Sequence, residues 1–211
     1  MAKTDVLTLA ILGTLAERPL HGYEIRKRLG AELGPFRALS YGSLYPCLKR
    51  MVEDGIIEVT EEAADPRRTA RSAAKASKAS ARKDASSARR SRIAYALTDA
   101  GKARLADELA SAGASSWDDD TFDVRFSLFA KTDSATRLRI LEGRRSRLVE
   151  RLDEIADARR ASRERHDKYT AELQRHGLER VEREVEWLDQ LIETERSASR
   201  GATQTASAGD N

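Results

Sequence analysis

The sequence predicts a mainly α-helical fold with three short helices and two strands near the N-terminus, followed by antiparallel, coiled-coil-like helices. Two observations support this fold class. Apolar residues recur at the 3,4 spacing of helices between residues 4 and 55 and again between residues 134 and 192. Only 5% of residues are aromatic and 35% are charged, which favours elongated helices over one thick core.

Three helices are expected in the first part of the chain. Residues 4–16 form the first helix, which Pro19 ends, and residues 21–33 form the second, with Tyr23 among its inward residues. The third helix spans residues 40–55, begins with the polar cap Ser40 and ends at Gly55. This arrangement is typical of a helix-turn-helix whose last helix enters a DNA major groove.

Two strands follow the third helix and complete a winged helix-turn-helix over residues 1–110. Residues 56–60 are rich in β-branched side chains, and Ile93, Tyr95 and Leu97 alternate with smaller residues, so the two runs are expected to pair as a two-stranded wing. Thr98 is the expected cap of the helix after the wing.

A basic insert lies between the two strands. Residues 64–92 contain no Val, Ile, Leu or aromatic residue and are expected to form a disordered loop at the wing tip. Within it, residues 66–92 hold ten Lys and Arg against one acidic residue, a balance of +9 in a chain of net charge +3. The ten are Arg67, Arg68, Arg71, Lys75, Lys78, Arg82, Lys83, Arg89, Arg90 and Arg92. They can follow the phosphates of double-stranded DNA, although a solvated insertion without function is the alternative.

The third helix carries the residues expected to read DNA. Tyr41, Gly42 and Ser43 are predicted to meet base edges, while Lys49 meets a phosphate. Tyr45 is instead expected to pack inside. A glycine near a helix start costs about 1 kcal/mol relative to alanine, so Gly42 indicates close approach to DNA, an irregular first turn caused by Pro46, or both.

A linker and a short connecting element are expected over residues 111–133. Residues 111–121 are small and acidic, and Trp117 is expected to project from them. Residues 122–129 fit both the strand period and the helix period, and helix is the favoured interpretation.

Residues 134–196 are predicted to form two helices that dimerise, with a turn at His176 and Gly177. The apolar positions of the two seams are Leu138, Leu141, Leu148, Leu152, Ile155, Leu178, Val181, Val185, Leu188 and Ile192. Thin seams of this kind cannot cover each other fully, so they need the N-terminal unit or a second copy of the chain. The tail, residues 197–211, is expected to be disordered.

Three residues are candidates for binding a small-molecule effector. Trp117 and Trp187 could stack on an aromatic ligand, although ordinary packing is the favoured interpretation for Trp187. Arg145, the polar residue in the first seam, could bind an anionic ligand or pair with an acidic residue of a partner helix.

Several function classes are disfavoured by the sequence. It has no Gly-rich phosphate loop, nucleophile elbow or metal-ligand cluster, so no catalytic residue, metal or cofactor is expected. The single cysteine, Cys47, cannot form an intrachain disulfide, and the apolar run at residues 6–12 is too short to span a membrane. A cytoplasmic protein without a membrane partner is expected.

Three segments resemble the PadR family of winged-helix transcriptional regulators. They are ILGTLAERPLHGYEIRKRL, SYGSLYPCLKRMVEDGIIE and RIAYALTDAGKARLADEL, and the helical C-terminal part is similar to the dimerisation region of the longer PadR branch. The resemblance implies a homodimer that binds a pseudo-palindromic operator, usually as a repressor and often released by a small molecule. The long insert departs from the short wing of the family. The alternatives are an architectural DNA-binding protein that relies on its basic loop, and a helical adaptor for another protein.

Overall fold

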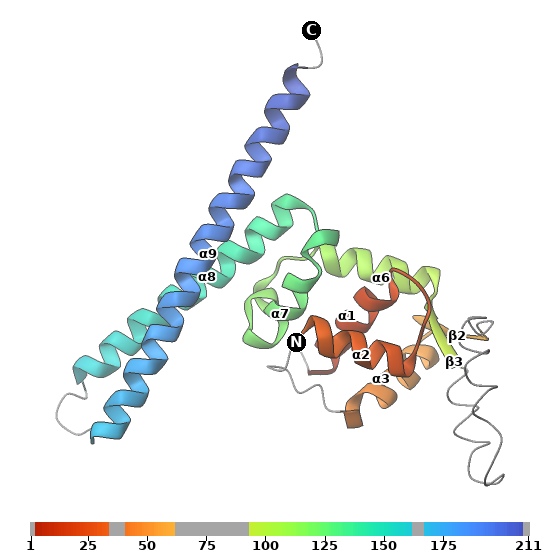
Figure 1. Cartoon of the computed structure of the whole chain (residues 1–211), viewed down its shortest axis with the longest axis horizontal. Helices are drawn as coiled ribbons and strands as arrows, with labels where there is room; N and C mark the ends of the chain where they lie inside the picture. The colour runs from red at the N-terminus through yellow and green to blue at the C-terminus, as the bar shows by residue number, and fades with distance from the viewer. Residues whose placement is uncertain (1–2, 34–40, 62–92, 162–166, 209–211) are drawn as a thin grey trace, which may run out of the picture. The chain divides into compact units, whose positions relative to one another are not determined.

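A computed structural model describes residues 3–33, 41–61, 93–161 and 167–208 (Figure 1). The chain divides into two compact units, Met1–Glu108 and Leu109–Asn211. Helices dominate both units, and the first also contains a small antiparallel sheet. The mainly α-helical prediction is therefore confirmed.

The first unit is a winged helix-turn-helix. Its elements are α1 (Lys3–Leu15), β1 (Leu20–His21), α2 (Gly22–Glu32), α3 (Tyr41–Glu53), β2 (Ile57–Glu61), β3 (Ile93–Leu97) and α6 (Asp99–Ala110). The predicted strands pair antiparallel, with Val59 opposite Tyr95. The predicted insert at residues 64–92 lies outside the described residues.

A third strand, which the sequence did not predict, joins the wing. β1 pairs with β3, so the strand order is β1-β3-β2. Leu20 is fully buried, and His21 Nδ1 lies 3.0 Å from the carbonyl oxygen of Ile93. Two residues after Pro19 are enough for this pairing, but they are too few to show an alternating pattern.

The core of the first unit lies between α1 and the elements around it. Ile11, Leu12, Ile25 and Leu48 have no exposed surface, and α1 contacts α2, α3 and β3. The inward placement of Tyr23 is wrong, since its side chain is 61% exposed. In α2 the buried positions are 22, 25 and 29, and the residue after Gly22 points about 100° away from that face.

The joint between α3 and the wing contains the predicted caps. Gly55 adopts φ 69°, a left-handed conformation that glycine favours. The Ile56 amide donates to the Met51 carbonyl at 2.9 Å and the Gly55 amide to the Val52 carbonyl at 3.0 Å, which together form a Schellman cap. The Thr98 hydroxyl lies 2.7 Å from the Gly55 carbonyl oxygen and accepts the Gly101 amide at 3.1 Å, as expected for a cap of α6.

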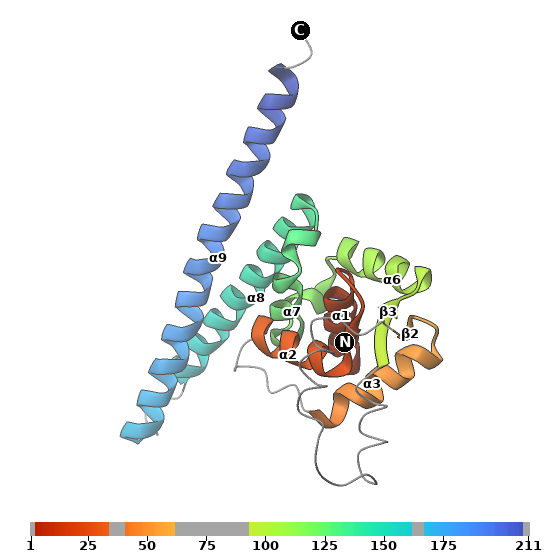
Figure 2. The ribbon, with the colours of Figure 1, turned by 45° about the vertical axis from the view of Figure 1, so that its right-hand side comes forward.

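The second unit is a helical assembly built on two long antiparallel helices. Its elements are the 3₁₀ turn η1 (Ala114–Trp117), α7 (Asp119–Ser127), the 3₁₀ turn η2 (Phe129–Lys131), α8 (Ser134–Ala161) and α9 (Lys168–Ala208). Figures 1 and 2 show α8 and α9 side by side, with the C-terminal end of α9 reaching beyond the start of α8. No helix within the described ranges is long and apolar enough to cross a membrane.

Residues 111–121 differ from the expected linker. They contain η1 and the start of α7, and Phe122 is 3% exposed in the apolar core of the unit. Asp119 and Asp120 lie in the first turn of α7, where the helix dipole favours negative charge. The helical interpretation of the segment that follows is confirmed through Ser127.

The predicted turn at His176 and Gly177 is wrong. α9 begins at Lys168 and continues through both residues, whereas α8 ends at Ala161. The Asp167 carboxylate accepts the Tyr169 amide at 2.8 Å, so this aspartate caps α9. A glycine costs a helix interior only about 1 kcal/mol, which a 41-residue helix tolerates.

Gly177→Ala is expected to raise the free energy of unfolding by about 0.5–1 kcal/mol, because alanine favours a helix interior. No atom outside its own helix backbone lies within 4 Å of a Cβ built at this position. Urea titration followed by circular dichroism measures the change. A loss of stability would indicate a left-handed cap at Gly177 and contradict the continuous helix.

The predicted disordered tail is helical through Ala208, so residues 197–208 depart from that expectation. Contacts with α8 hold α9 near the start of this segment. Ser199 Oγ lies 2.7 Å from Ser134 Oγ, and Arg196 Nη2 lies 2.7 Å from Glu142 Oε1. Residues 209–211 are outside the described part.

Candidate nucleic-acid interface

Helix α3 has one buried face and one exposed face. Leu44, Cys47, Leu48 and Met51 are at most 4% exposed and hold the helix in the core. Gly42, Ser43 and Lys49, all predicted to contact DNA, are exposed. Tyr41 begins α3, but its side chain lies outside the described part of the structure. The structure therefore places three of the predicted contact residues on one accessible surface.

Lys49 has an acidic neighbour on the same helix. Its Nζ lies 3.5 Å from Glu53 Oε1, and the two side chains are 79% and 60% exposed. An exposed pair at this spacing contributes only about 0.3–0.5 kcal/mol. A phosphate can therefore replace Glu53 as the partner of Lys49 at little cost.

Gly42 lies near the start of α3 and is exposed. Pro46 is inside the same helix and has no amide hydrogen, so it cannot donate to the Gly42 carbonyl. The explanation from an irregular first turn is therefore compatible with the structure. Exposure of Gly42 is equally compatible with close approach of DNA.

Tyr45 does not pack inside as expected, since its side chain is 54% exposed. The core-facing positions of α3 are 44, 47, 48 and 51, and Tyr45 points away from them. Three residues after Gly42 and four before Lys49, it lies between them on the exposed face. The exposure of Tyr45 is not evident from the sequence because its spacing from Leu48 and Val52 also fits the buried stripe.

The basic insert cannot be placed on this surface. All ten of its Lys and Arg residues lie within residues 62–92, outside the described ranges. Their contact with DNA stays a prediction. In the part of the chain that is described, no three His, Cys, Asp or Glu side chains gather as a metal site.

Comparison with known proteins agrees with the geometry of the first unit. The model of the transcriptional regulator PadR-like family matches residues 11–72, which include α2, α3 and β2. Through this segment, the chain is similar to the PadR-like family. The matched family and the curated relative are transcriptional regulators, which agrees with the expectation that the chain is not an enzyme.

Individual PadR proteins show the extent of the likeness. The negative transcriptional regulator PadR of Bacillus subtilis (strain 168) is 40% identical over 52 residues, which are 25% of this chain and 29% of that protein. The crystal structure of B. subtilis PadR in complex with operator DNA is 20% identical, covers 90% of this chain and 99% of that chain, and has a TM-score of 0.36. A complex with p-coumaric acid is 19% identical, with the same coverage and a TM-score of 0.35.

The residues predicted for dimerisation pack against one another within a single chain. Leu141, Leu148, Leu188 and Ile192 are at most 5% exposed and form a cluster with Phe122 and Ile140. Leu138, Val181 and Val185 are half-buried against this cluster, and Leu152, Ile155 and Leu178 are also half-buried. The two seams thus face each other, and a second copy could contact only the part that remains exposed.

The predicted effector residues have different surroundings. Arg145 Nε lies 2.5 Å from Asp189 Oδ1, so its acidic partner is in the same chain, and this carboxylate raises the pKa of Arg145. Trp117 packs tightly on Gly143 of α8, because a Cβ built there would overlap the indole ring. Trp187 is 38% exposed and lies 5.2 Å from the Phe126 ring centre.

Arg144 was not predicted from the sequence, and with Arg125 it is one of the buried arginines among the described residues of this unit. Its side chain is only 7% exposed. Its guanidinium donates to Glu184 Oε1 at 2.7 Å, to the Trp117 carbonyl at 2.8 Å and to Asp119 Oδ1 at 2.5 Å. It also lies 5.3 Å from the centre of the Phe122 ring. Arg144 therefore joins η1, α7, α8 and α9.

The spacing of the first seam could have identified Arg144. Leu141 and Leu148 are seven residues apart, so the seam position between them is 144 if a step of three comes first and 145 if a step of four comes first. In the structure the step of three comes first, so the buried seam position is Arg144. An arginine in this position is tolerated because two carboxylates and a carbonyl satisfy it.

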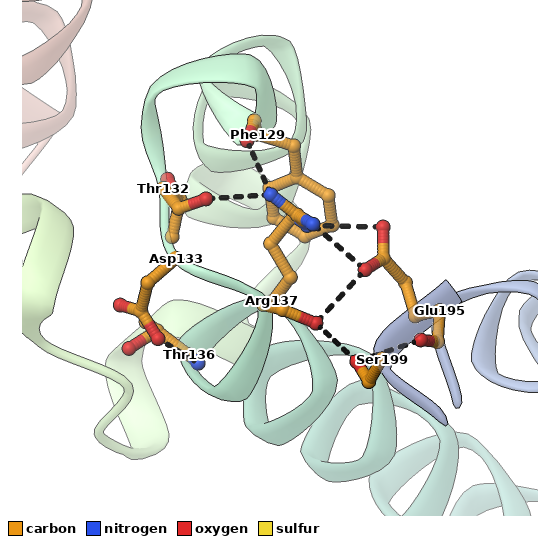
Figure 3. Close-up of polar contacts among 8 residues, drawn as sticks. Phe129, Thr132, Asp133, Thr136, Arg137, Glu195 and Ser199 are labelled. Atoms are coloured by element: carbon orange, nitrogen blue, oxygen red, sulfur yellow. Dashed lines mark hydrogen bonds and ion pairs between the residues drawn. The ribbon is translucent and has the colours of Figure 1, made fainter. Parts of the chain in front are cut away.

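A second arginine fixes the C-terminal part of α9, as Figure 3 shows. Arg137 donates from Nε and Nη2 to the two oxygens of Glu195, each at 2.9 Å. Its Nη1 donates to the carbonyls of Phe129 and Thr132 at the end of η2. This bidentate pair connects α9 with α8 within the second unit.

Proposed function

We propose that this chain is a transcriptional repressor that binds a pseudo-palindromic operator in double-stranded DNA as a homodimer. The observation that carries the proposal is the exposed face of α3, with Gly42, Ser43 and Lys49 opposite a buried apolar face. In the proposed complex Tyr41, Gly42 and Ser43 meet base edges, and Lys49 meets a phosphate. The name of the B. subtilis relative, a negative regulator, supports repression rather than activation.

The proposal divides DNA binding between two parts of the first unit. α3 carries two basic residues, Lys49 and Arg50, and one acidic residue, Glu53, so its own charge supplies little affinity. The insert at residues 66–92 has a balance of +9. Release of counterions from phosphates by these residues would supply affinity without reading sequence. Specificity then belongs to α3.

The second unit is proposed to hold two copies of the chain together. Two apolar side chains near the start of α9 support this assignment: Tyr169 is 83% and Leu173 71% exposed. They lie four residues apart on one helix face, next to which a second copy could pack. In a dimer of this kind, the helical units set the distance between the two copies of α3.

A small aromatic ligand is proposed to release the repressor from DNA. Among the three predicted effector residues, Trp187 has the surroundings that suit such a ligand best. Its partly exposed ring adjoins Phe122 and Phe126 at centre distances of 6.3 and 5.2 Å. Trp117 and Arg145 would need to leave Gly143 and Asp189, respectively, before contacting a ligand.

Selection of bound fragments from random duplex DNA tests the proposed function. We expect the unmodified protein to enrich an inverted repeat whose half-sites are separated by about one helical turn, roughly 10 base pairs, or a multiple of it. Half-site spacing would then report the geometry of the dimer. Recovery of fragments without a common sequence would contradict the repressor proposal and favour an architectural DNA-binding protein that uses its basic insert.

A further inference from the structure

The rings of Tyr45 and Tyr95 both lie close to Gly22, at the edge of the exposed face of α3. A Cβ built on Gly22 would lie 3.1 Å from Tyr45 Cε1 and 3.7 Å from Tyr95 Cε2. Gly22 is the first residue of α2, whereas the two tyrosines belong to α3 and β3. The absence of a side chain at Gly22 thus leaves room for both rings, which we call the tyrosine pair.

The tyrosine pair connects the exposed face of α3 with the wing. Tyr95 lies opposite Val59 in the β2–β3 ladder, and Val59 is 49% exposed. Residues directly opposite each other in a ladder have their side chains on the same face of the sheet. The surface therefore runs from Lys49 through Tyr45 and Tyr95 to Val59.

The Tyr95 phenol remains protonated at neutral pH. Burial raises the pKa of Tyr95, and the nearby Tyr45 phenol raises it further. A protonated phenol can donate one hydrogen bond while accepting others. Tyr95 is half-buried and Tyr45 is mostly exposed, so Tyr45 is the member that can reach a ligand.

We propose that the Tyr45 hydroxyl donates a hydrogen bond to a backbone phosphate of bound DNA, with Tyr95 as the residue that positions its ring. This inference rests on the proposed function and assigns Tyr45 a role in it. Tyrosine hydroxyls are among the neutral donors that fix a protein on the phosphate backbone without reading sequence. Tyr45 lies on the same exposed face of α3 as Gly42 and Lys49, so DNA that meets these residues also passes Tyr45.

Tyr45→Phe tests the contact with the full chain and mixed-sequence duplex DNA at low salt, for which no operator is needed. Because hydrogen bonds to charged groups are the stronger ones, we expect affinity to fall by about tenfold or more. The slope of log K against log salt should stay unchanged, since a neutral phenol displaces no counterion. Tyr23→Phe, which removes a 61% exposed phenol from α2, is the matched control and should leave affinity unchanged.

A second variant addresses the position of the ring. Gly22→Ala introduces a methyl group 3.1 Å from Tyr45 Cε1, which displaces the ring, so it should weaken binding to the same DNA. Combining it with Tyr45→Phe should add little if both changes act through one hydroxyl. Thermal unfolding of each variant verifies that the fold is retained.

The possible outcomes separate this inference from the proposed function. If the unmodified protein binds and Tyr45→Phe binds equally well, the phosphate contact is overturned while DNA binding stands. If Tyr45→Phe weakens binding to the selected operator but not to mixed-sequence DNA, Tyr45 contacts a base, and the phosphate assignment is overturned. Failure of the unmodified protein to bind any duplex at low salt would overturn both proposals.

Discussion

Arg144→Met is expected to lower the free energy of unfolding by about 3 kcal/mol, because it removes a buried cation from partners that remain in place. The variant keeps the apolar stem and loses the bonds to Glu184, Asp119 and the Trp117 carbonyl. The Trp117 carbonyl is then left without this donor, which adds to the cost. Urea titration followed by circular dichroism measures the difference.

Arg145→Met is the matched control for this substitution. Arg145 pairs with Asp189, but the side chains are 41% and 51% exposed. Exposed pairs contribute at most about 1 kcal/mol, so this variant should differ little from the unmodified protein. Equal losses at positions 144 and 145 would contradict the assignment of Arg144 as the buried link between the helices.

The contact between Arg144 and Asp119 is expected to make the stability of the fold depend on pH in the acidic range. Burial alone would raise the pKa of Asp119, but hydrogen bonding and the charge of Arg144 outweigh it, and the pKa is lowered from 3.8. Because the folded pKa is below the unfolded one, this carboxylate stabilises the fold above pH 3.8, and the contribution is lost as pH falls through the folded pKa. Arg144→Met should weaken this part of the acid dependence.

Gly101→Ala is expected to lower the free energy of unfolding by about 2 kcal/mol, despite the better helix propensity of alanine. A Cβ at this position would overlap the Ile56 carbonyl oxygen and lie 3.3 Å from Leu97 Cδ2. The backbone cannot retreat easily, because the Thr98 amide and hydroxyl hydrogen-bond the same carbonyl at 3.2 and 2.9 Å. Chemical denaturation gives the size of the loss.

Gly30→Ala is the control for Gly101→Ala and is expected to change the free energy of unfolding in the opposite direction. Gly30 lies inside α2, and nothing is within 4 Å of a Cβ built there. Alanine should therefore raise the free energy of unfolding by about 0.5–1 kcal/mol. If Gly101→Ala were also stabilising, the close approach of α6 to the joint between α3 and the wing would be contradicted.

The parts of the fold that the sequence predicted best have a local cause. Gly55 follows a helical apolar pattern and precedes β-branched residues, and the Schellman cap depends on those same few residues. Thr98 likewise bonds an amide three residues ahead. Such caps are decided within one turn of the chain, so a short sequence window contains the information needed to predict them.

The missed features depend on contacts between distant residues. β1 forms because Leu20 and His21 find β3, which lies more than seventy residues later in the chain. Gly177 fits a helix end by its local sequence, yet α9 continues through it. The first part of the α9 extension has a similar origin, since Ser199 contacts Ser134 of α8.

The candidate site was predicted only in part for the same reason. Exposure of Gly42, Ser43 and Lys49 follows from the apolar stripe on the other side of α3. For Tyr45 the stripe is ambiguous, and its place beside Gly22 and Tyr95 requires α2 and β3 to be folded. Arg144 and Arg145 both fit the seam spacing, and only the folded unit distinguishes them: the side chain of Arg144 is 7% exposed and that of Arg145 is 41% exposed.

Competition binding tests the central claim most directly: that α3 gives this chain sequence-specific recognition of DNA. Labelled operator, taken from the selected inverted repeat, is bound at physiological salt and displaced with unlabelled operator or mixed-sequence duplex. The account predicts a preference of about 10³ or more for the operator. A ratio near one would contradict it and indicate an architectural protein bound through charge alone.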